Sequence, residues 1–381
     1  MSRWHKLIHQ TETQFDRALA RSRASGDDPL LIQSYLSYGV PGRVLVMGRV
    51  LEDRGVAAAE QDDSLWENFK GAWKRFHSGE IAHAELRVTL AGSSETFEAQ
   101  VKTDDEGYFA QWLDVPGLEL PDVSLGDDQL LTFDLELTHP ERTPPVRSEA
   151  LALIPSPDAR FGVVSDIDDT VLQTGATSIR SLARQVLFGN AYTRLPFEGV
   201  TAFYEALTTD GNPLFYVSSS PWNLYDVLVE FMELNNIPLG PVLLRDWGLS
   251  ATELLPTSHG SHKQAAIRQI LETYPQLPFI LIGDSGQEDP EIYHGIVHDF
   301  PGRILGIYIR DVDDDAARRE SVQKLAQALQ EDGSTLLLTA DTGAAAAHAA
   351  AQGWIHKDAV ARVAERRDAE GQAEAVSATK P

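Results

Sequence analysis

The apolar residues of this chain of 381 residues change their spacing near residue 155. Before that point apolar and polar residues alternate, which is typical of strands that pack on one face and meet water on the other. The clearest alternating segments are 85–90, 96–102 and 132–138. After that point the apolar residues form unbroken runs, which indicate strands buried on both faces of a parallel sheet; these runs are 162–164, 214–217 and 279–282. We therefore expect two domains of different architecture.

The alternating part predicts an antiparallel β-sandwich-like domain over residues 31–154, for which the sequence indicates no role and no partner. Further strands are expected at 43–51, 108–113 and 148–154, with turns at 103–107 and 140–145. A helix at Trp4 to Ala24, within residues 1–30, is expected to precede this domain. Pro155-Ser-Pro157 is interpreted as the junction with the second domain.

Residues capable of chemistry follow each unbroken apolar run. The first run is followed by Asp166-Ile-Asp168, the second by Ser218-Ser-Ser220, and the third by the acids Asp284 and Asp289. Because the carboxyl ends of parallel strands meet at one edge of a sheet, these side chains are expected to face one crevice. Lys263 lies in a predicted helix, 262–271, just before the third run. An acid pair, a hydroxyl, a lysine and a second acid pair thus follow in that order.

This order resembles the haloacid dehalogenase-like (HAD-like) phosphohydrolases, whose motifs are D-x-D-x-T, a Ser or Thr at a strand end, a Lys, and G-D-x4-D. More narrowly, residues 155 to 315 resemble the catalytic domain of the actin-patch type of phosphatidate phosphatase. The residues that carry this resemblance are Asp166-Ile-Asp-Asp-Thr170, Ser218-Ser-Ser-Pro-Trp222-Asn-Leu-Tyr225, His262 through Pro275, Gly283-Asp284 to Asp289 with Tyr293, and Ile307-Tyr-Ile-Arg310-Asp311. The resemblance implies an α/β fold with a HAD-like (Rossmannoid) parallel sheet and a small cap.

The resemblance also implies roles for these residues. Asp166 would attack phosphorus to form an aspartyl-phosphate, and Asp168 would act as general acid and then as general base. Ser218 and Lys263 would hold the phosphoryl oxygens. The residues implied in substrate binding are Thr170, Ser218, Ser219 and Lys263. Mg²⁺ is the implied cofactor, with Asp166, the carbonyl of Asp168, and Asp284 as ligands and Asp289 in support.

Plainer interpretations stand beside these roles. Asp166 and Asp168 could cap a helix, Ser219 or Ser220 could replace Ser218, and Ser220 before Pro221 could instead begin the next helix. Lys263 could be a solvated helix lysine, and Glu288 could take the part of Asp289. The irregular spacing of His259, His262, His294 and His298 favours ordinary histidines over a transition-metal site. The acidic residues Asp311 and Asp313 to Asp315 are interpreted as a helix start.

Composition limits the classes of function. The formal charge of −25 opposes nucleic-acid binding and unassisted binding to anionic membranes, although it leaves lipid substrates open. No cysteine is present, which excludes disulfides. No secretory signal or transmembrane run is seen, so we expect a cytoplasmic protein, with peripheral membrane contact as an option.

The catalytic domain is expected to span 155–367. It should contain a strand at 335–338 and helices near 178–188, 200–207, 343–352 and 357–367. Residues 368–381 are expected to be disordered. The short intervals between motifs leave no room for a large lid, which suggests an open site. Leu187, Phe188, Tyr192 and Phe197 could form an apolar rim there or simply pack in the core.

We therefore expect a Mg²⁺-dependent phosphohydrolase of phosphomonoesters, and by resemblance one that acts on phosphatidate-type lipid at a membrane surface. One alternative is a phosphatase of soluble or protein-bound phosphate with the same site residues. Another is an adaptor whose first domain binds a partner while the second is only weakly active.

Overall fold

The structure is a computed structural model in which residues 30–52, 79, 81–90, 97–116, 124–125, 128–171, 197–245, 259–312, 315–331 and 333–378 are described. The expected helix at Trp4 to Ala24 and the expected helix at 178–188 lie outside these residues, as do Leu187, Phe188 and Tyr192 of the expected rim. The chain divides into two compact units, Met1–Pro155 and Ser156–Pro381.

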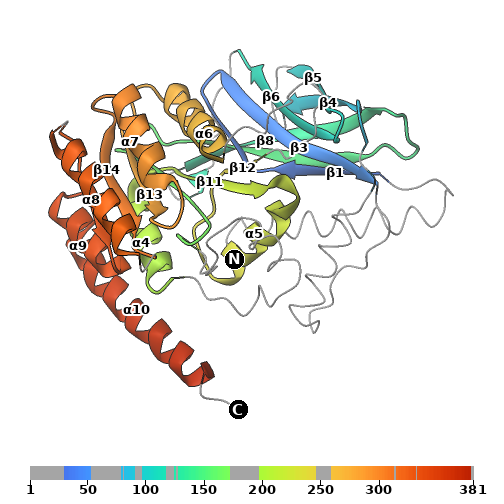
Figure 1. Ribbon diagram of the computed structural model, residues 1–381. Helices are drawn as coiled ribbons and strands as arrows, with labels where there is room; N and C mark the ends of the chain where they lie inside the picture. Colours follow the sequence, from blue (N-terminus) through green and yellow to red (C-terminus); the bar gives the residue numbers. More distant parts are fainter. Residues whose placement is uncertain are drawn as a thin grey trace. The chain divides into compact units, whose positions relative to one another are not determined.

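The first unit is built from strands (Figure 1). They are β1 (Leu30–Tyr35), β2 (Ser37–Val40), β3 (Arg43–Glu52), β4 (Glu85–Leu90), β5 (Glu98–Lys102), β6 (Tyr108–Asp114), β7 (Ser124–Leu125), β8 (Asp128–His139) and β9 (Arg147–Ile154). Their hydrogen-bonded order is β1-β3-β2-β9-β8-β4-β5, with β6 beside β3 and β7 beside β8. Inward-facing side chains from both halves of this order, such as Val46, Leu86 and Phe133, form one buried apolar cluster, so the two halves pack face to face as in a sandwich.

One pairing departs from the predicted antiparallel arrangement. Strands β2 and β9 are parallel, with Ser37 opposite Ala152 and Tyr38 opposite Leu153. The sequence did not lead us to predict β1 or β2. In β2 the residues do not alternate, because Ser37, Tyr38 and Gly39 are all buried. All the other strand pairs that the structure describes in the first unit are antiparallel, as predicted.

The second unit contains a six-stranded parallel sheet, which confirms the predicted parallel arrangement. Its strands are β10 (Gly162–Ser165), β11 (Leu214–Pro221), β12 (Val242–Arg245), β13 (Phe279–Asp284), β14 (Ile304–Arg310) and β15 (Leu336–Thr339). The order across the sheet is β12-β11-β10-β13-β14-β15. The chain thus winds outward from β10 in one direction and then from β13 in the other, as in doubly wound folds.

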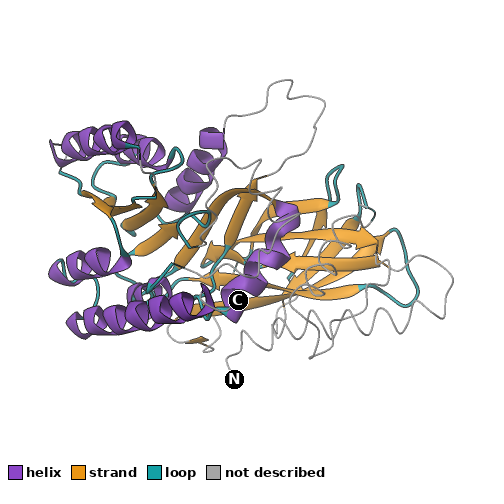
Figure 2. Ribbon diagram, turned by 60° about the horizontal axis from the view of Figure 1, so that its bottom comes forward, coloured by secondary structure: helices purple, strands orange, loops and turns teal. Residues whose placement is uncertain are grey.

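Helices cover both faces of this sheet (Figure 2). They are α4 (Val200–Leu207), α5 (Tyr225–Leu234), α6 (His259–Thr273), α7 (Asp289–Asp299), α8 (Ala316–Glu331), α9 (Thr342–Ala351) and α10 (Lys357–Ala378), with 3-10 turns at Thr209–Gly211 and Trp222–Leu224. On one face α6 contacts β11 and β12, α7 contacts β13 and β14, and α8 contacts β15. On the other, α4, α9 and α10 contact one another, and α9 contacts β15.

The C-terminal segment differs from its prediction. Residues 368–381 were expected to be disordered, but α10 continues to Ala378. The segment is rich in Ala and also contains Glu, both good helix formers, and Arg366 just before it pairs with Glu370 one turn later. Helix propensity therefore extends α10 where few apolar residues remain to be buried.

None of the described helices has both the length and the apolar character needed to cross a membrane.

The centre of the parallel sheet requires a glycine at position 162. A Cβ atom built there would lie 2.3 Å from Cε1 of Phe279 on the neighbouring strand β13. Both positions are buried, and the two residues are register partners. Gly162 therefore lets the aromatic ring of Phe279 lie against the backbone where β10 and β13 begin, at the other end of the strands from Asp166 and Asp284.

Gly162→Ala should destabilise the second unit by about 1–3 kcal/mol, because the added methyl group overpacks the sheet at Phe279. The measurement is thermal and urea unfolding of the full chain. Gly295→Ala is the control, since that glycine lies inside α7 and a Cβ there meets only the flexible end of Gln264, at 3.3 Å. The control should be neutral or stabilising; equal losses in both variants would contradict the overpacking.

Candidate active site

The acidic residues lie where the winding of the parallel sheet reverses. β10 and β13 are neighbours in the sheet but far apart in the sequence, and the chain leaves them in opposite directions. Asp166 follows β10 directly, and Asp284 is the last residue of β13. Crevices at this reversal, at the carboxyl ends of the strands, are the usual ligand sites of open α/β sheets.

Asp166 is fully buried and held from several sides. Its backbone N–H donates to the carbonyl of Ile282 on β13, at 2.9 Å. Its carboxylate accepts hydrogen bonds from Lys263 Nζ at 2.9 Å and from Thr170 Oγ1 at 3.2 Å. The Asp166 carboxylate is therefore oriented before any ligand binds.

Lys263 is buried on α6, with 2% of its side chain exposed, so it is not a solvated helix lysine. Its ammonium group also donates to Asp289 Oδ1, so one cation joins acids from β10 and α7. Burial opposes the charged form, but the carboxylates of Asp166 and Asp289 raise the pKa of Lys263 above its ordinary value. The lysine therefore remains protonated.

Asp284, the last residue of β13, and Asp289, the first residue of α7, flank one short loop. The backbone N–H of Asp284 donates to Asp289 Oδ2 at 3.2 Å. Asp284 Oδ1 accepts from the N–H groups of Gly286, at 2.7 Å, and Gln287, at 3.0 Å. A Cβ at Gly283 would lie 2.4 Å from Asp289 Oδ2, so only glycine allows this close approach.

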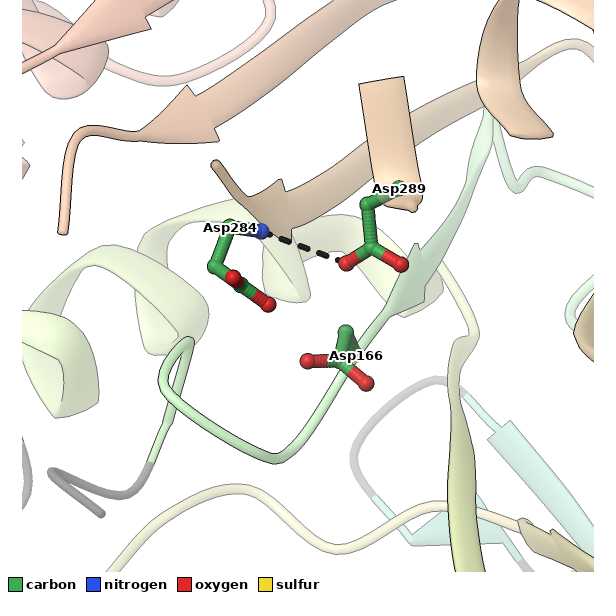
Figure 3. Close-up of side chains that lie close together, drawn as sticks. All are labelled: Asp166, Asp284 and Asp289. Atoms are coloured by element: carbon green, nitrogen blue, oxygen red, sulfur yellow. Dashed lines mark hydrogen bonds between the residues drawn. The ribbon is translucent and has the colours of Figure 1, made fainter. Parts of the chain in front are cut away.

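Three carboxylates converge on one point (Figure 3). One oxygen each from Asp166, Asp284 and Asp289 lies within 4.8 Å of the other two, and all three residues are buried. This is the spacing of oxygen atoms around a shared cation. Among the described residues none of the four histidines belongs to such a group.

Asp168 faces the end of β11. Its Oδ2 accepts hydrogen bonds from Ser218 Oγ at 2.7 Å and Ser220 Oγ at 3.2 Å. Its Oδ1 is buried and accepts no hydrogen bond from any residue that the structure describes. One oxygen of Asp168 is thus fixed by serines while the other remains available for a ligand.

Burial dominates the electrostatics of the acids. Burial raises the pKa of Asp168, although the hydrogen bond from Ser218 lowers it. Burial also raises the pKa of Asp166 well above its usual range, although the charge of Lys263 lowers it. Burial together with the Asp289 carboxylate raises the pKa of Asp284 to about 8. Five aspartates (Asp166, Asp168, Asp169, Asp284 and Asp289) are buried here with one lysine, so further positive charge would stabilise their ionised forms.

A divalent oxygen-binding cation fits this set of donors. Asp284 Oδ2, like Asp168 Oδ1, is buried and accepts no hydrogen bond from the described part of the chain. Mg²⁺ binds carboxylate and carbonyl oxygens and retains several waters. Asp166, Asp284 and Asp289 offer the carboxylates, and the Asp168 carbonyl, now 3.5 Å from Gln287 Nε2, faces the same loop.

The structure brings most of the residues singled out from the sequence to one edge of the sheet. Thr170 contacts Asp166, and Ser218 contacts Asp168, as described above. Ser219 is buried in β11, but the described hydrogen bonds from serines to Asp168 come from Ser218 and Ser220. Ser220 caps neither of the helical segments that follow it: Pro221 is the N-cap of the 3-10 turn Trp222–Leu224, and Leu224 is the N-cap of α5.

The acidic run before α8 was interpreted as a helix start, and this is confirmed for Asp315, whose Oδ1 accepts from the N–H of Ala317. Asp311 instead pairs with Arg319, at 2.6 Å. Asp313 and Asp314 lie outside the described residues.

Sequence reasoning missed the residues that support the acids. Ser165 Oγ lies 2.6 Å from the carbonyl oxygen of Asp166 and 2.6 Å from Tyr204 OH, so Tyr204 on α4 fixes the end of β10 through Ser165. Asp169 adopts a positive φ of 54°, a sparsely populated conformation for a residue other than glycine. Only Asp169 lies within a recognisable motif; Tyr204 has the pattern of an ordinary core residue.

Comparison with known proteins identifies relatives of this part of the chain. Residues 161–311 match the family described as "Phosphatidate phosphatase APP1, catalytic domain". Phosphatidate phosphatase APP1 of Saccharomyces cerevisiae is 36% identical over 152 residues, which are 39% of this chain and 26% of the yeast protein. An uncharacterized protein of Schizosaccharomyces pombe is 32% identical over 158 residues, 41% of this chain and 26% of that protein.

Among solved structures, the match to a β-glucuronidase of Parabacteroides merdae covers 74% of this chain and 34% of the glucuronidase chain, at 11% identity and a TM-score of 0.24. This structural similarity is too low to carry an argument.

These matches confirm the resemblance to the actin-patch type of phosphatidate phosphatase. The matched residues include β10 through β14 and all the acidic residues of the site. The match does not extend to the first unit, and the aligned segment spans about a quarter of each curated relative.

Lys263→Met should destabilise the second unit by about 3–5 kcal/mol at pH 8, because methionine fills similar space but leaves buried carboxylates without their cation. The loss should shrink towards pH 5, because burial raises the pKa of Asp166 well above its usual range and protonation of this acid then removes unpaired charge. Urea unfolding at both pH values is the measurement. The same loss at both would mean that packing rather than charge causes it.

Proposed function

We propose that the second unit is a HAD-like, Mg²⁺-dependent phosphohydrolase that cleaves phosphomonoesters, with phosphatidate-type lipid as the substrate. The observation that carries the proposal is the convergence of Asp166, Asp284 and Asp289 around Lys263 at the reversal of the parallel sheet. The similarity of residues 161–311 to a phosphatidate phosphatase catalytic domain supports the same conclusion.

Asp166 is the proposed nucleophile. One of its carboxylate oxygens forms a bond to phosphorus while the bond from phosphorus to the alkoxide oxygen breaks, giving an aspartyl-phosphate and an alcohol. Lys263 and Thr170 support this role, because they hold the carboxylate in a fixed orientation. Lys263 also offers positive charge next to the transferred group.

Asp168 is the proposed acid and base. Its raised pKa favours the protonated form that a leaving alkoxide requires. In the second half of the reaction the deprotonated Asp168 takes a proton from water, the hydroxide oxygen bonds to phosphorus, and the bond to Asp166 breaks, releasing phosphate. Ser218 and Ser220 hold one oxygen of Asp168, which leaves Oδ1 for proton transfer.

Asp166, Asp284, Asp289 and the Asp168 carbonyl are proposed to hold Mg²⁺. When bound, the cation would neutralise charge on the phosphoryl oxygens. The roles of Ser218, Ser219 and Lys263 as contacts of the phosphoryl oxygens remain predictions. In this structure Ser218 and Lys263 bind acids, so a substrate would have to share or replace those hydrogen bonds.

Asp166→Asn should abolish phosphate release, because the amide lacks the charge and nucleophilicity of the carboxylate at nearly the same volume. Release is measured with Mg²⁺ on phosphatidate in mixed micelles and on a soluble phosphomonoester. Faster turnover of the soluble ester would replace the lipid assignment with a soluble-phosphate one, and absence of turnover on both would favour the adaptor. Substantial activity of the folded variant would remove Asp166 from its role.

Mg²⁺ should raise the thermal unfolding temperature of the wild-type protein, with a stabilisation of about 2.7 kcal/mol at 100 times its dissociation constant. Asp284→Asn should lose this rise, while the asparagine oxygen can keep the hydrogen bonds from Gly286 and Gln287. NaCl at matched ionic strength is the control. Full activity in EDTA, or an unchanged rise in the variant, would contradict the metal assignment.

A further inference from the structure

Arg318 on α8 makes an unusual set of contacts with the loop that joins Asp284 to Asp289. Its Nε donates to the carbonyl of Ser285 at 2.6 Å, and its Nη2 donates to the carbonyl of Gln287. The same guanidinium group binds both carboxylate oxygens of Glu291, with Nη2 to Oε2 at 3.0 Å. One rigid, planar group thus joins two loop carbonyls and the first turn of α7.

The contact with Ser285 acts directly on a carboxylate of the site. The carbonyl of Ser285 and the N–H of Gly286 belong to one planar trans peptide, so they point in opposite directions. That N–H donates to Asp284 Oδ1 at 2.7 Å. When Arg318 fixes the carbonyl outside the loop, it therefore also fixes the hydrogen bond that orients Asp284 inside it.

The ion pair between Arg318 and Glu291 fixes the orientation of the guanidinium group. The arginine side chain is 21% exposed and the glutamate 44%, and two parallel hydrogen bonds join them. Because both carboxylate oxygens of Glu291 are engaged, the planar guanidinium is held in one orientation towards the loop.

We infer that Arg318 is a positioning residue that sets the affinity of the carboxylate site for a divalent cation. The inference rests on the proposed function, because it needs Asp284 to be a ligand. The described hydrogen bonds of Arg318 go to the carbonyls of Ser285 and Gln287 and to Glu291, not to the three converging carboxylates, so it acts through the Ser285–Gly286 peptide. Residues that orient metal ligands in this way typically change metal affinity 10- to 100-fold when replaced.

Arg318→Ala should raise the Mg²⁺ concentration that half-saturates the thermal shift by roughly tenfold or more. The rate of phosphate release at saturating Mg²⁺ should recover, because no group that contacts substrate is lost. Arg318→Lys should be intermediate, since one ammonium cannot bind both carbonyls and the carboxylate together. Should Arg318→Ala fail to fold, Glu291→Gln provides the same test with a smaller rise.

The matched control is Arg319→Ala. Arg319 is the next residue on α8 and also forms an ion pair, with Asp311 at 2.6 Å. Its loss should leave the half-saturating Mg²⁺ concentration unchanged. An equal rise in both variants, or no rise in Arg318→Ala, overturns the inference. A wild-type protein without any Mg²⁺-dependent shift instead overturns the metal part of the proposed function.

Discussion

The second unit depends on a single buried ammonium group among buried carboxylates. Lys263 joins Asp166 after β10 to Asp289 at the start of α7, and both acids are fully buried. Burying such charges costs several kcal/mol each unless they are paired and hydrogen-bonded. The lysine, Thr170 and the backbone N–H groups of the loop therefore have to be in place together, which links three elements distant in the sequence.

The parallel sheet supplies the frame for this linkage. β10 and β13 are neighbours because the chain reverses its winding between them, and their carboxyl ends bring Asp166 and Asp284 together. Gly283 permits the close approach of the Asp289 carboxylate, whereas Gly162 lets the ring of Phe279 pack where β10 and β13 begin. The position of the acids thus follows from topology and from the absence of a side chain at Gly283.

Sequence reasoning could predict the acids but not their supports. Asp166, Asp284 and the serines of β11 follow apolar runs, so a strand pattern is enough to place them at one edge. The contact of Lys263 with Asp289 joins two helices and needs the tertiary fold. Arg318 lies in the segment Ala-Ala-Arg-Arg-Glu, where the sequence alone predicts an ordinary solvent-exposed helix residue. Strand β2 was missed because burial on both faces hides its period.

The same excess of acid that suits the site for a cation weakens the fold without one. Asp284 Oδ2 and Asp168 Oδ1 are buried without hydrogen bonds from the described residues, and burial raises the pKa of both acids. Any ligand that neutralises them binds the folded state alone and stabilises it by mass action. The loop from Asp284 to Asp289 is held to α8 by Arg318, outside the acidic cluster. Because Arg318 holds the loop from outside the cluster, the carboxylate oxygens of the acids are oriented and still available for ligands. A site for a cation and a phosphoryl group requires both.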